Sequence, residues 1–295
     1  MRIRDSYHLY AFITVLCWSL IFVLTRIMMP EVSSASIGAL RCVIASVTMM
    51  IALALMSSRL PRMKDIPLFL LTGFVGFYLY LLMFNEGLKT ANSSLGSVII
   101  ATSPIITAVL ANLLHKERLR LFQWLSMALS LIGVIVLSMM RDSTSALTGI
   151  LWLVAAAFLI SYYNILQRSL SRRYTALETA TYSMVGGTIF YLFHLPKAIS
   201  EMQNVPLIYV FYILILGVFS SAIAYVMWTK ALSRAELASQ VTNYMFVTPF
   251  LSSFWGFVLA GEMVSKATLA GGALILAGLF FFNWGEAILT IWSSR

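Results

Sequence analysis

The sequence predicts an all-α polytopic membrane protein, with ten transmembrane helices arranged as two inverted five-helix repeats. Three observations predict this class. The 295-residue chain is 60% hydrophobic and only 11% charged, whereas soluble domains carry roughly 25% charged residues. Apolar runs of about 20 residues, each long enough to span a bilayer core of ~30 Å, recur along the whole chain. Finally, positions in the first half match positions in the second.

We place ten apolar spans along the chain, and each is predicted to be a helix. A backbone in lipid has no water to bond with, so its hydrogen bonds must form within each segment. The alternating pattern of membrane β-strands is absent from the sequence. The loops are short and leave no room for a soluble domain. The spans are 9–28, 35–56, 66–87, 94–114, 121–140, 146–167, 176–195, 207–228, 236–260 and 267–290.

The two halves of the chain, 1–142 and 143–295, are predicted to be copies of one five-helix unit. Each has an apolar segment interrupted by a proline, Pro104 in the first half and Pro249 in the second. Since five is an odd number, the second half must enter the membrane from the opposite side. Paired, interrupted helices in inverted halves are typical of the binding sites of secondary transporters. Further positions match in the same order: Leu88 with Leu232, Ala91 with Ala235, Glu117 with Glu262, and Gly133 with Gly278.

The net charge of +9 is explained by topology rather than by a surface for nucleic acid. If the N-terminus is cytoplasmic, the ten spans place most Lys and Arg in inner loops, as is usual for membrane proteins. We therefore predict a protein of the bacterial inner membrane with both termini in the cytoplasm, and nucleic acid is not an expected partner. The cations predicted on the outer side are Arg26, Lys89, Arg141, Lys197 and Lys266.

Motifs of catalysis and of cofactor binding are absent from the sequence. No P-loop, H-E-x-x-H or G-x-S-x-G pattern occurs, and the three histidines have no partner at metal-ligand spacing. We therefore expect no enzymatic activity, no cofactor and no metal. A channel is an alternative, but a single chain contains no filter-like loop and no ring of charge. An oligomer would be needed to build one, and a monomer is favoured.

The two interrupted spans are the first candidates for a transport site. Proline lacks an N–H and frees the carbonyl one turn earlier, which in lipid then needs a side chain, water or substrate as its partner. We interpret Pro104 and Pro249 as hinges beside a polar cavity. The alternative is that they are tolerated kinks whose serines and threonines help the helices to pack. Nearby polar residues predicted to contact substrate are Ser97, Asn243 and Tyr244.

Aromatic residues deep within the spans form the second candidate group. A buried Tyr or Trp needs a partner for its polar tip, so those on faces that also carry Asn, Ser or Gly are predicted to contact substrate. The alternative is ordinary packing between helices. The set comprises Trp18, Tyr78, Tyr80, Tyr163, Tyr225 and Trp228, together with Asn164 beside Tyr163.

Charged residues within the spans are few. Arg41 lies about 12 Å into the second span if that helix begins at Ser33, a depth at which an unpaired charge is costly. It is predicted either to bind a substrate carboxylate with its planar fork, or to pair with helix-end carbonyls or Glu86. Glu86 is the best-placed carboxylate for proton coupling. Glu117 and Glu262 each close a span and are predicted to cap or tether the next helix.

In their order and doubling, these residues resemble the EamA repeat of the drug/metabolite transporter superfamily. The resemblance covers essentially the whole chain. It implies a ten-helix inverted-repeat transporter, with a cavity lined by the third, fourth, eighth and ninth helices and contributions from the first and sixth. The first copy reads Asn85-Glu86-Gly87-Leu88-Lys89-Thr90-Ala91, Ser103-Pro104 and Lys116-Glu117. The second reads Trp228-Thr229-Lys230-Ala231-Leu232-Ser233-Arg234-Ala235, Thr248-Pro249 and Gly261-Glu262.

The sequence therefore predicts a secondary transporter that moves small metabolites by alternating access. Efflux of amino acids, including aromatic ones, is the first expectation, because deep aromatics supply stacking contacts while hydroxyls and amides fix orientation. The alternatives are channel-like facilitation, or export of drugs, quaternary amines or nucleobases. The expected partners are the lipid bilayer and a small-molecule substrate.

Overall fold

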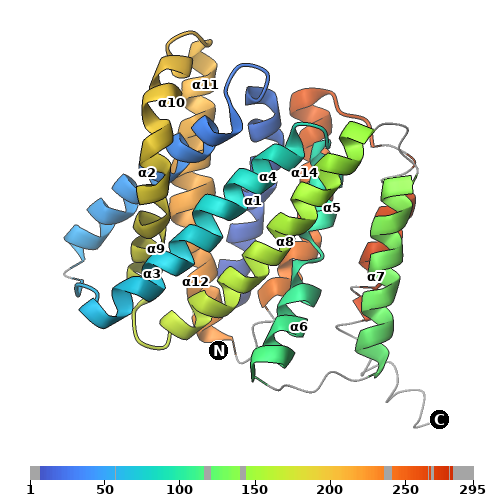
Figure 1. Cartoon of the computed structure of the whole chain (residues 1–295), viewed down its shortest axis with the longest axis horizontal. Coiled ribbons are helices and arrows are strands. Elements are labelled where there is room, and N and C mark those ends of the chain that lie inside the picture. The colour runs from blue at the N-terminus through green and yellow to red at the C-terminus, as the bar shows by residue number, and fades with distance from the viewer. Residues whose placement is uncertain are drawn as a thin grey trace.

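The chain folds into a bundle of helices that run between two edges of the molecule (Figure 1). The structure, a computed structural model, describes residues 7–56, 58–115, 121–139, 144–235, 241–264, 266, 269–278 and 280–281. All regular secondary structure in these residues is helical. We call the edge that holds the start of the first helix and loop 56–62 the lower edge. The opposite edge, which holds loops 29–33 and 89–92, is the upper edge.

The first half begins with two long helices, α1 (Tyr7–Met28) and α2 (Ser34–Leu55). The third segment is continuous but changes its winding, as η2 (Met63–Asp65), α3 (Ile66–Gly73), η3 (Phe74–Leu79) and α4 (Tyr80–Leu88). Then follow α5 (Ser93–Ile100), α6 (Ser103–His115) and α7 (Leu121–Met139).

The second half begins with the longest helix, α8 (Thr144–Leu170). The next segment consists of α9 (Ala176–Tyr191), η4 (Leu192–His194) and α10 (Leu195–Met202). The third runs through α11 (Leu207–Leu214), η5 (Ile215–Ile223) and α12 (Ala224–Arg234). It is followed by η6 (Asn243–Val247), α14 (Thr248–Ala260) and the helical segment Leu269–Gly278.

Within the described residues, six helical segments are long and apolar enough to cross a membrane. Thr248–Ala260 and Leu269–Gly278 are shorter apolar helices inside predicted spans that extend beyond the described residues. The all-helical prediction is therefore confirmed for the described residues, and six of the ten predicted spans are clear by length and composition. The six are Tyr7–Met28, Ser34–Leu55, Met63–Leu88, Ser93–Leu110, Leu147–Leu170 and Leu207–Arg234.

Local sequence signals set several helix ends. The Asn92 side chain accepts a hydrogen bond from the Leu95 N–H and so caps α5. Thr175 and Glu178 form a reciprocal capping box at the start of α9. Gly261 ends α14 in the left-handed conformation, with φ of 63°, which a residue without a Cβ adopts at little cost.

Both predicted proline interruptions coincide with a change in the helix. The chain turns at Ala101 and Thr102 between α5 and α6, and Pro104 lies in the first turn of α6. Pro249 likewise lies in the first turn of α14, directly after the 3-10 segment η6. A proline is tolerated in a first turn because the N–H that it lacks would have no helical partner there.

Two segments wind as π-helix, η3 in the first half and η5 in the second. Such segments are rare and often occur at functional sites. Each has a glycine in close contact with a neighbouring helix. A Cβ on Gly73, directly before η3, would lie 2.3 Å from the Gly187 nitrogen, and one on Gly217 in η5 would lie 2.5 Å from Ile44 Cγ2. At both positions the absence of a side chain on glycine allows the neighbouring helix to come this close.

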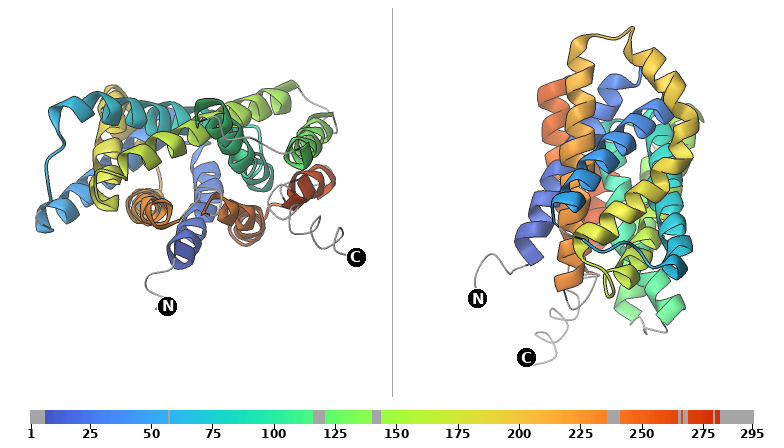
Figure 2. Two further views of the ribbon diagram at one scale, coloured as in Figure 1. Left: turned by 90° about the horizontal axis from the view of Figure 1, so that it is seen from below. Right: turned by 90° about the vertical axis from the view of Figure 1, so that its left-hand side faces the viewer.

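The helices form two layers when viewed from the lower edge (Figure 2). One contains α1, α12, α14 and Leu269–Gly278, and the other contains α3, α4, α8, α6 and α7. Contacts across the layers include those of α1 with α4, and of α8 with α12. The core between them is rich in aromatic residues, including Trp228, Tyr163 and Tyr225, which are almost completely buried.

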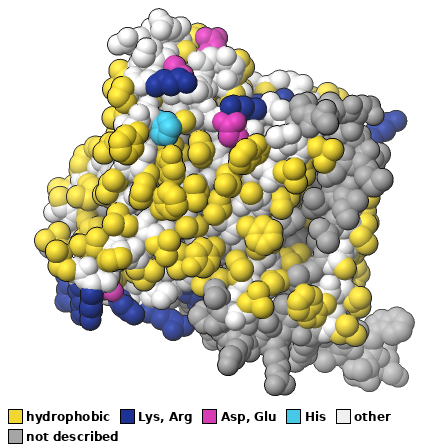
Figure 3. All heavy atoms as spheres, viewed as in Figure 1, with side chains coloured by type: hydrophobic (Ala, Val, Ile, Leu, Met, Phe, Trp, Pro, Cys, Tyr) yellow, Lys and Arg dark blue, Asp and Glu magenta, His cyan; other side chains and the backbone are white. Residues whose placement is uncertain are grey.

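The outer surface matches a membrane protein. Hydrophobic side chains cover the middle of the face in Figure 3, while Lys and Arg gather along its lower edge. Exposed apolar residues on α2 and α14 include Ile51, Leu55, Phe250 and Phe257. At the upper edge, cations pair with carboxylates: Arg26 with Glu262, Lys89 with Glu86, and Lys197 with Glu201.

Candidate functional site

A pocket between the two layers is the candidate site. Its cavity volume is small, about 20 Å³, and its walls come from α1, α4, α5, α8, α12, η6 and α14. Both halves of the chain therefore contribute to it. The predicted substrate contacts that line the pocket are Trp18, Tyr80, Ser97 and Tyr225.

A second group of predicted residues supports these walls. Trp228 packs on Trp18, with ring centroids 4.8 Å apart, and its Nε1–H donates to Asn164 Oδ1 at 3.0 Å. Tyr163 meets Tyr225 edge to face at 5.9 Å. Trp228, Asn164 and Tyr163 are almost completely buried. They do not line the pocket but fix the orientation of the aromatic rings that do.

Serine pairs join the two interrupted helices beside the pocket. The Ser252 hydroxyl donates to the Ser97 hydroxyl at 2.6 Å, and the Ser253 hydroxyl donates to that of Ser94 at 2.9 Å. Each pair links α5 of the first half to α14 of the second. Hydroxyl pairs of this kind stabilise close helix contacts in a bilayer by about 0.6 to 2 kcal/mol each.

Arg41 lies in the interior near the pocket but not in its wall. It is the eighth residue of α2, is 1% exposed, and donates from Nε to the Ser221 hydroxyl in η5 at 2.6 Å. Ser221 lies one turn before Tyr225, which does line the pocket. Glu86, which the sequence suggested as a partner of Arg41, pairs with Lys89 instead.

The remaining predicted residues are placed elsewhere. The Tyr78 hydroxyl lies 3.3 Å from His194 Nε2, and that of Tyr244 lies 2.5 Å from His8 Nδ1 near the lower edge. Glu86 is near the end of α4, 2.8 Å from Lys89 Nζ, so its coupling role stays a prediction. Asn243 begins η6, but its side chain lies outside the described residues, as does all of Glu117.

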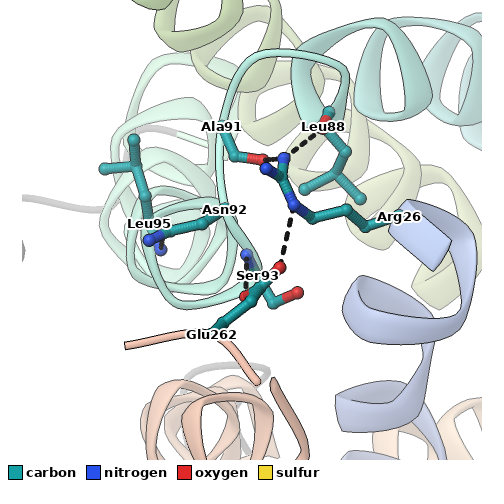
Figure 4. Close-up of polar contacts among 7 residues, drawn as sticks. All are labelled: Arg26, Leu88, Ala91, Asn92, Ser93, Leu95 and Glu262. Atoms are coloured by element: carbon teal, nitrogen blue, oxygen red, sulfur yellow. Dashed lines mark hydrogen bonds and ion pairs between the residues drawn. The ribbon is translucent and has the colours of Figure 1, made fainter. Parts of the chain in front are cut away.

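A cluster at the upper edge, which we call the Arg26 clamp, joins the two halves (Figure 4). Arg26 Nε lies 2.8 Å from Glu262 Oε1, and its Nη1 donates to the carbonyls of Leu88, at 3.0 Å, and Ala91. Glu262 Oε2 also accepts from the Ser93 N–H at 3.0 Å. Glu262 therefore caps α5, which belongs to the other half. Its predicted role at the next helix along the chain stays a prediction, because residues 265, 267 and 268 lie outside the described residues.

Sequence reasoning missed part of the pocket wall. Its missed residues are Phe22, Phe84, Ile100, Ile160, Met245 and Thr248, besides Ile21 and Ala101. Most are apolar residues in apolar spans and differ in no way from core residues before the helix faces are known. Thr248 is the exception, since it stands next to Pro249 and belongs to the polar surroundings of that break.

Trp228 gives a test of this supporting layer. The Trp228→Phe variant removes the Nε1–H and leaves the buried Asn164 Oδ1 without its donor, which costs about 1–3 kcal/mol. The Trp228→Ala variant also leaves a cavity and costs about 3–5 kcal/mol. Thermal melting of the purified protein in detergent measures both. Adding Asn164→Leu to Trp228→Phe should recover part of the loss, and a double variant weaker than either single one would contradict the pairing.

The helical bundle and its apolar surface define a multi-pass membrane protein, and comparison with known sequences assigns it to a class. The model of the EamA-like transporter family matches residues 5–139 and again residues 147–284. The chain belongs to the EamA-like transporter family. The resemblance found in the repeated motifs is thereby confirmed.

Named relatives are transporters as well. The uncharacterized transporter YdfC of Bacillus subtilis is 33% identical, over 82% of this chain and 79% of its own length. A probable terminal-alkyne amino-acid exporter of Streptantibioticus cattleyicolor is 30% identical, over 92% of this chain and 91% of its own. A protein of known crystal structure has a similar fold, with a TM-score of 0.65 at 21% identity, covering 94% of this chain and 96% of that one.

Proposed function

We propose that this protein is a secondary transporter that exports amino acids or related small metabolites by alternating access. The aromatic pocket with walls from both halves carries the proposal. Apolar and aromatic walls with a few hydroxyls suit a small solute with an apolar side chain. The similarity to a probable amino-acid exporter supports amino acids as the first class to test.

The proposal includes two inverted halves, 1–142 and 143–295. Two successive matches to one family model support it, and so does the pattern of packing. Exchanging the halves turns several of the observed contacts into others: α1 with α12 corresponds to α8 with α4, α2 with η5 to α9 with η3, and α1 with α14 to α8 with α6. A pseudo-twofold axis in the membrane plane is the arrangement expected of such exchanges.

The moving parts in this proposal are the interrupted helices and the segments after the π-helical turns. Pro104 and Pro249 lie in the first turns of new helices in the two halves. Tyr80 directly follows η3, and Tyr225 lies two residues after η5. Bending at these four positions would open the pocket to one side while the other side stays closed. The positive-inside rule supports the basic lower edge as the cytoplasmic one, which puts the Arg26 clamp on the outer side of a bacterial inner membrane.

Flux through sealed proteoliposomes tests the proposed function. The twenty common amino acids are tested one at a time, with unlabelled amino acid inside the vesicles and the same amino acid, labelled, outside. For the substrates of the protein, the label should accumulate inside at a rate that saturates with its outside concentration. A channel would give a rate that rises linearly with concentration. Uptake of quaternary amines or nucleobases alone would replace the proposed substrate, and no flux of any solute would overturn the proposal.

Pro249 separates a hinge from a tolerated kink. Pro249→Ala should lower the rate of exchange by about tenfold, because the break before α14 is the proposed hinge. The Pro249 ring is buried, so its loss should also lower the melting temperature, which is measured beside the rate. Pro67→Ala is the control for removing a first-turn proline, since Pro67 lies in the first turn of α3 but is exposed and has no neighbour in sequence that lines the pocket. Equal rates for the two variants would show that the break at Pro249 is only structural.

A further inference from the structure

The guanidinium of Arg41 is buried with most of its hydrogen-bonding capacity unused. Nε donates to Ser221, but neither Nη1 nor Nη2 has a partner among the residues that the structure describes. The side chain is 1% exposed and lies about 10 Å along α2 from its start at Ser34, at ~1.5 Å per residue. A buried charge with open donors is costly unless an anion completes it.

No described acidic side chain is placed to be that anion. Among the residues that the structure describes, every Asp and Glu lies in a loop or near a helix end: Glu31, Asp65, Glu86, Glu178, Glu201 and Glu262. Glu86, Glu201 and Glu262 each have a cation of their own.

The position of Arg41 connects it to the pocket. The helix that carries Arg41, α2, packs against α4 and η5. The pocket residue Tyr80 begins α4, and the pocket residue Tyr225 lies two residues after η5. Ser221, which holds the guanidinium by Nε, lies one turn before Tyr225. With Nε fixed in this way, the two Nη groups are the free donors. The pocket wall adds another unpartnered donor, the Trp18 Nε1–H.

We propose that Arg41 is the anion subsite of the transporter and recognises the carboxylate of the substrate through Nη1 and Nη2. This inference rests on the proposed transport function and specifies which substrates it admits. A carboxylate matches the planar fork of a guanidinium with two parallel hydrogen bonds. An ammonium group finds only neutral acceptors in the described part of the site and is repelled by Arg41. The site therefore requires the carboxylate and tolerates loss of the amino group.

Competition by matched analogues tests this rule. For each amino acid that the wild-type protein exchanges, its deaminated acid and its decarboxylated amine are added as inhibitors of exchange. The acid should inhibit at a concentration at least about tenfold lower than the amine, as expected for a lost charged hydrogen bond. In Arg41→Gln this preference should disappear. Equal inhibition by acid and amine in the wild type, or an unchanged preference in Arg41→Gln, would overturn the proposal.

Two further variants keep the test decisive if Arg41→Gln does not fold. Arg41→Lys keeps the charge but loses the fork, so inhibition by the acid should weaken while inhibition by the amine stays unchanged. Ser46→Ala is the control, because Ser46 is a buried residue of the same helix that bonds to Thr188, and it should keep the wild-type preference. Exchange of amines but of no amino acid would leave a transporter without this subsite. Absence of all exchange would overturn the transport proposal itself.

Discussion

Gly73→Ala should strongly destabilise the protein, because the added methyl group would collide with the backbone of a neighbouring helix. The new Cβ would lie 2.3 Å from the Gly187 nitrogen and 2.4 Å from the Ser183 carbonyl oxygen. Both atoms belong to the backbone of α9, so no side chain can rotate away and the helices must separate. Overpacking of this kind costs about 3 kcal/mol or more. The measurement is the melting temperature and the yield of monodisperse protein in detergent.

Gly272→Ala is the matched control for this substitution. Its Cβ would meet nothing closer than Val98 Cγ2 at 3.5 Å, which is ordinary contact, and its melting temperature should stay close to that of the wild type. If Gly73→Ala melted at the same temperature as Gly272→Ala, α3 and α9 would not pack as closely as the structure indicates.

Breaking the Arg26 clamp should lower the rate of exchange by about tenfold. Removing either Arg26 or Glu262 leaves the remaining polar groups of the cluster without hydrogen-bond partners at a contact between the halves. Arg26→Ala removes the donor to the Leu88 and Ala91 carbonyls, and Glu262→Ala removes the cap of α5 at Ser93. Since both changes break the same cluster, the double variant should be little worse than the poorer single one. Exchange rates in proteoliposomes measure this.

The control for the clamp is another ion pair at the same edge. Lys89→Ala breaks an exposed pair at the end of α4, and such pairs contribute about 0–1 kcal/mol, so exchange should change little. Multiplicative losses in the Arg26 and Glu262 double variant would mean that the two residues act independently, which would contradict a joint role at the interface of the halves.

The sequence predicted the helices well because composition and length decide them. A bilayer admits few structures, so apolar runs of span length identified the segments that the structure shows as helices. The breaks at Pro104 and Pro249 could also be predicted, because the effect of a proline on its helix is local. Site residues depend on which helix faces meet. Trp18 and Tyr225 were predicted to contact substrate and line the pocket, whereas Tyr78 and Tyr244 had the same local signals and lie elsewhere.

Contacts between the halves were beyond sequence reasoning. Glu262 was matched with Glu117 by the repeat, but nothing in a linear pattern indicates that it reaches Ser93 and Arg26, far away in the first half. The sequence likewise left two roles for Arg41, binding of a substrate carboxylate or structural pairing, because the choice depends on which groups surround it in the folded chain. Only the folded chain shows that Glu86 is paired with Lys89 and that two donors of the guanidinium stay open.

The π-helical turns change the direction in which the side chains after them project from the helix. Each extra residue in a wide turn advances the chain by about 100° around the helix axis relative to an unbroken α-helix. The π-helical turns η3 and η5 therefore determine that Tyr80 and Tyr225 lie on the helix faces that line the pocket. A shift of a π-helical turn by a few residues along its helix would rotate Tyr80 or Tyr225 about the helix axis. Few backbone hydrogen bonds would be lost, so the helix could reorient these side chains without exposing its backbone to lipid.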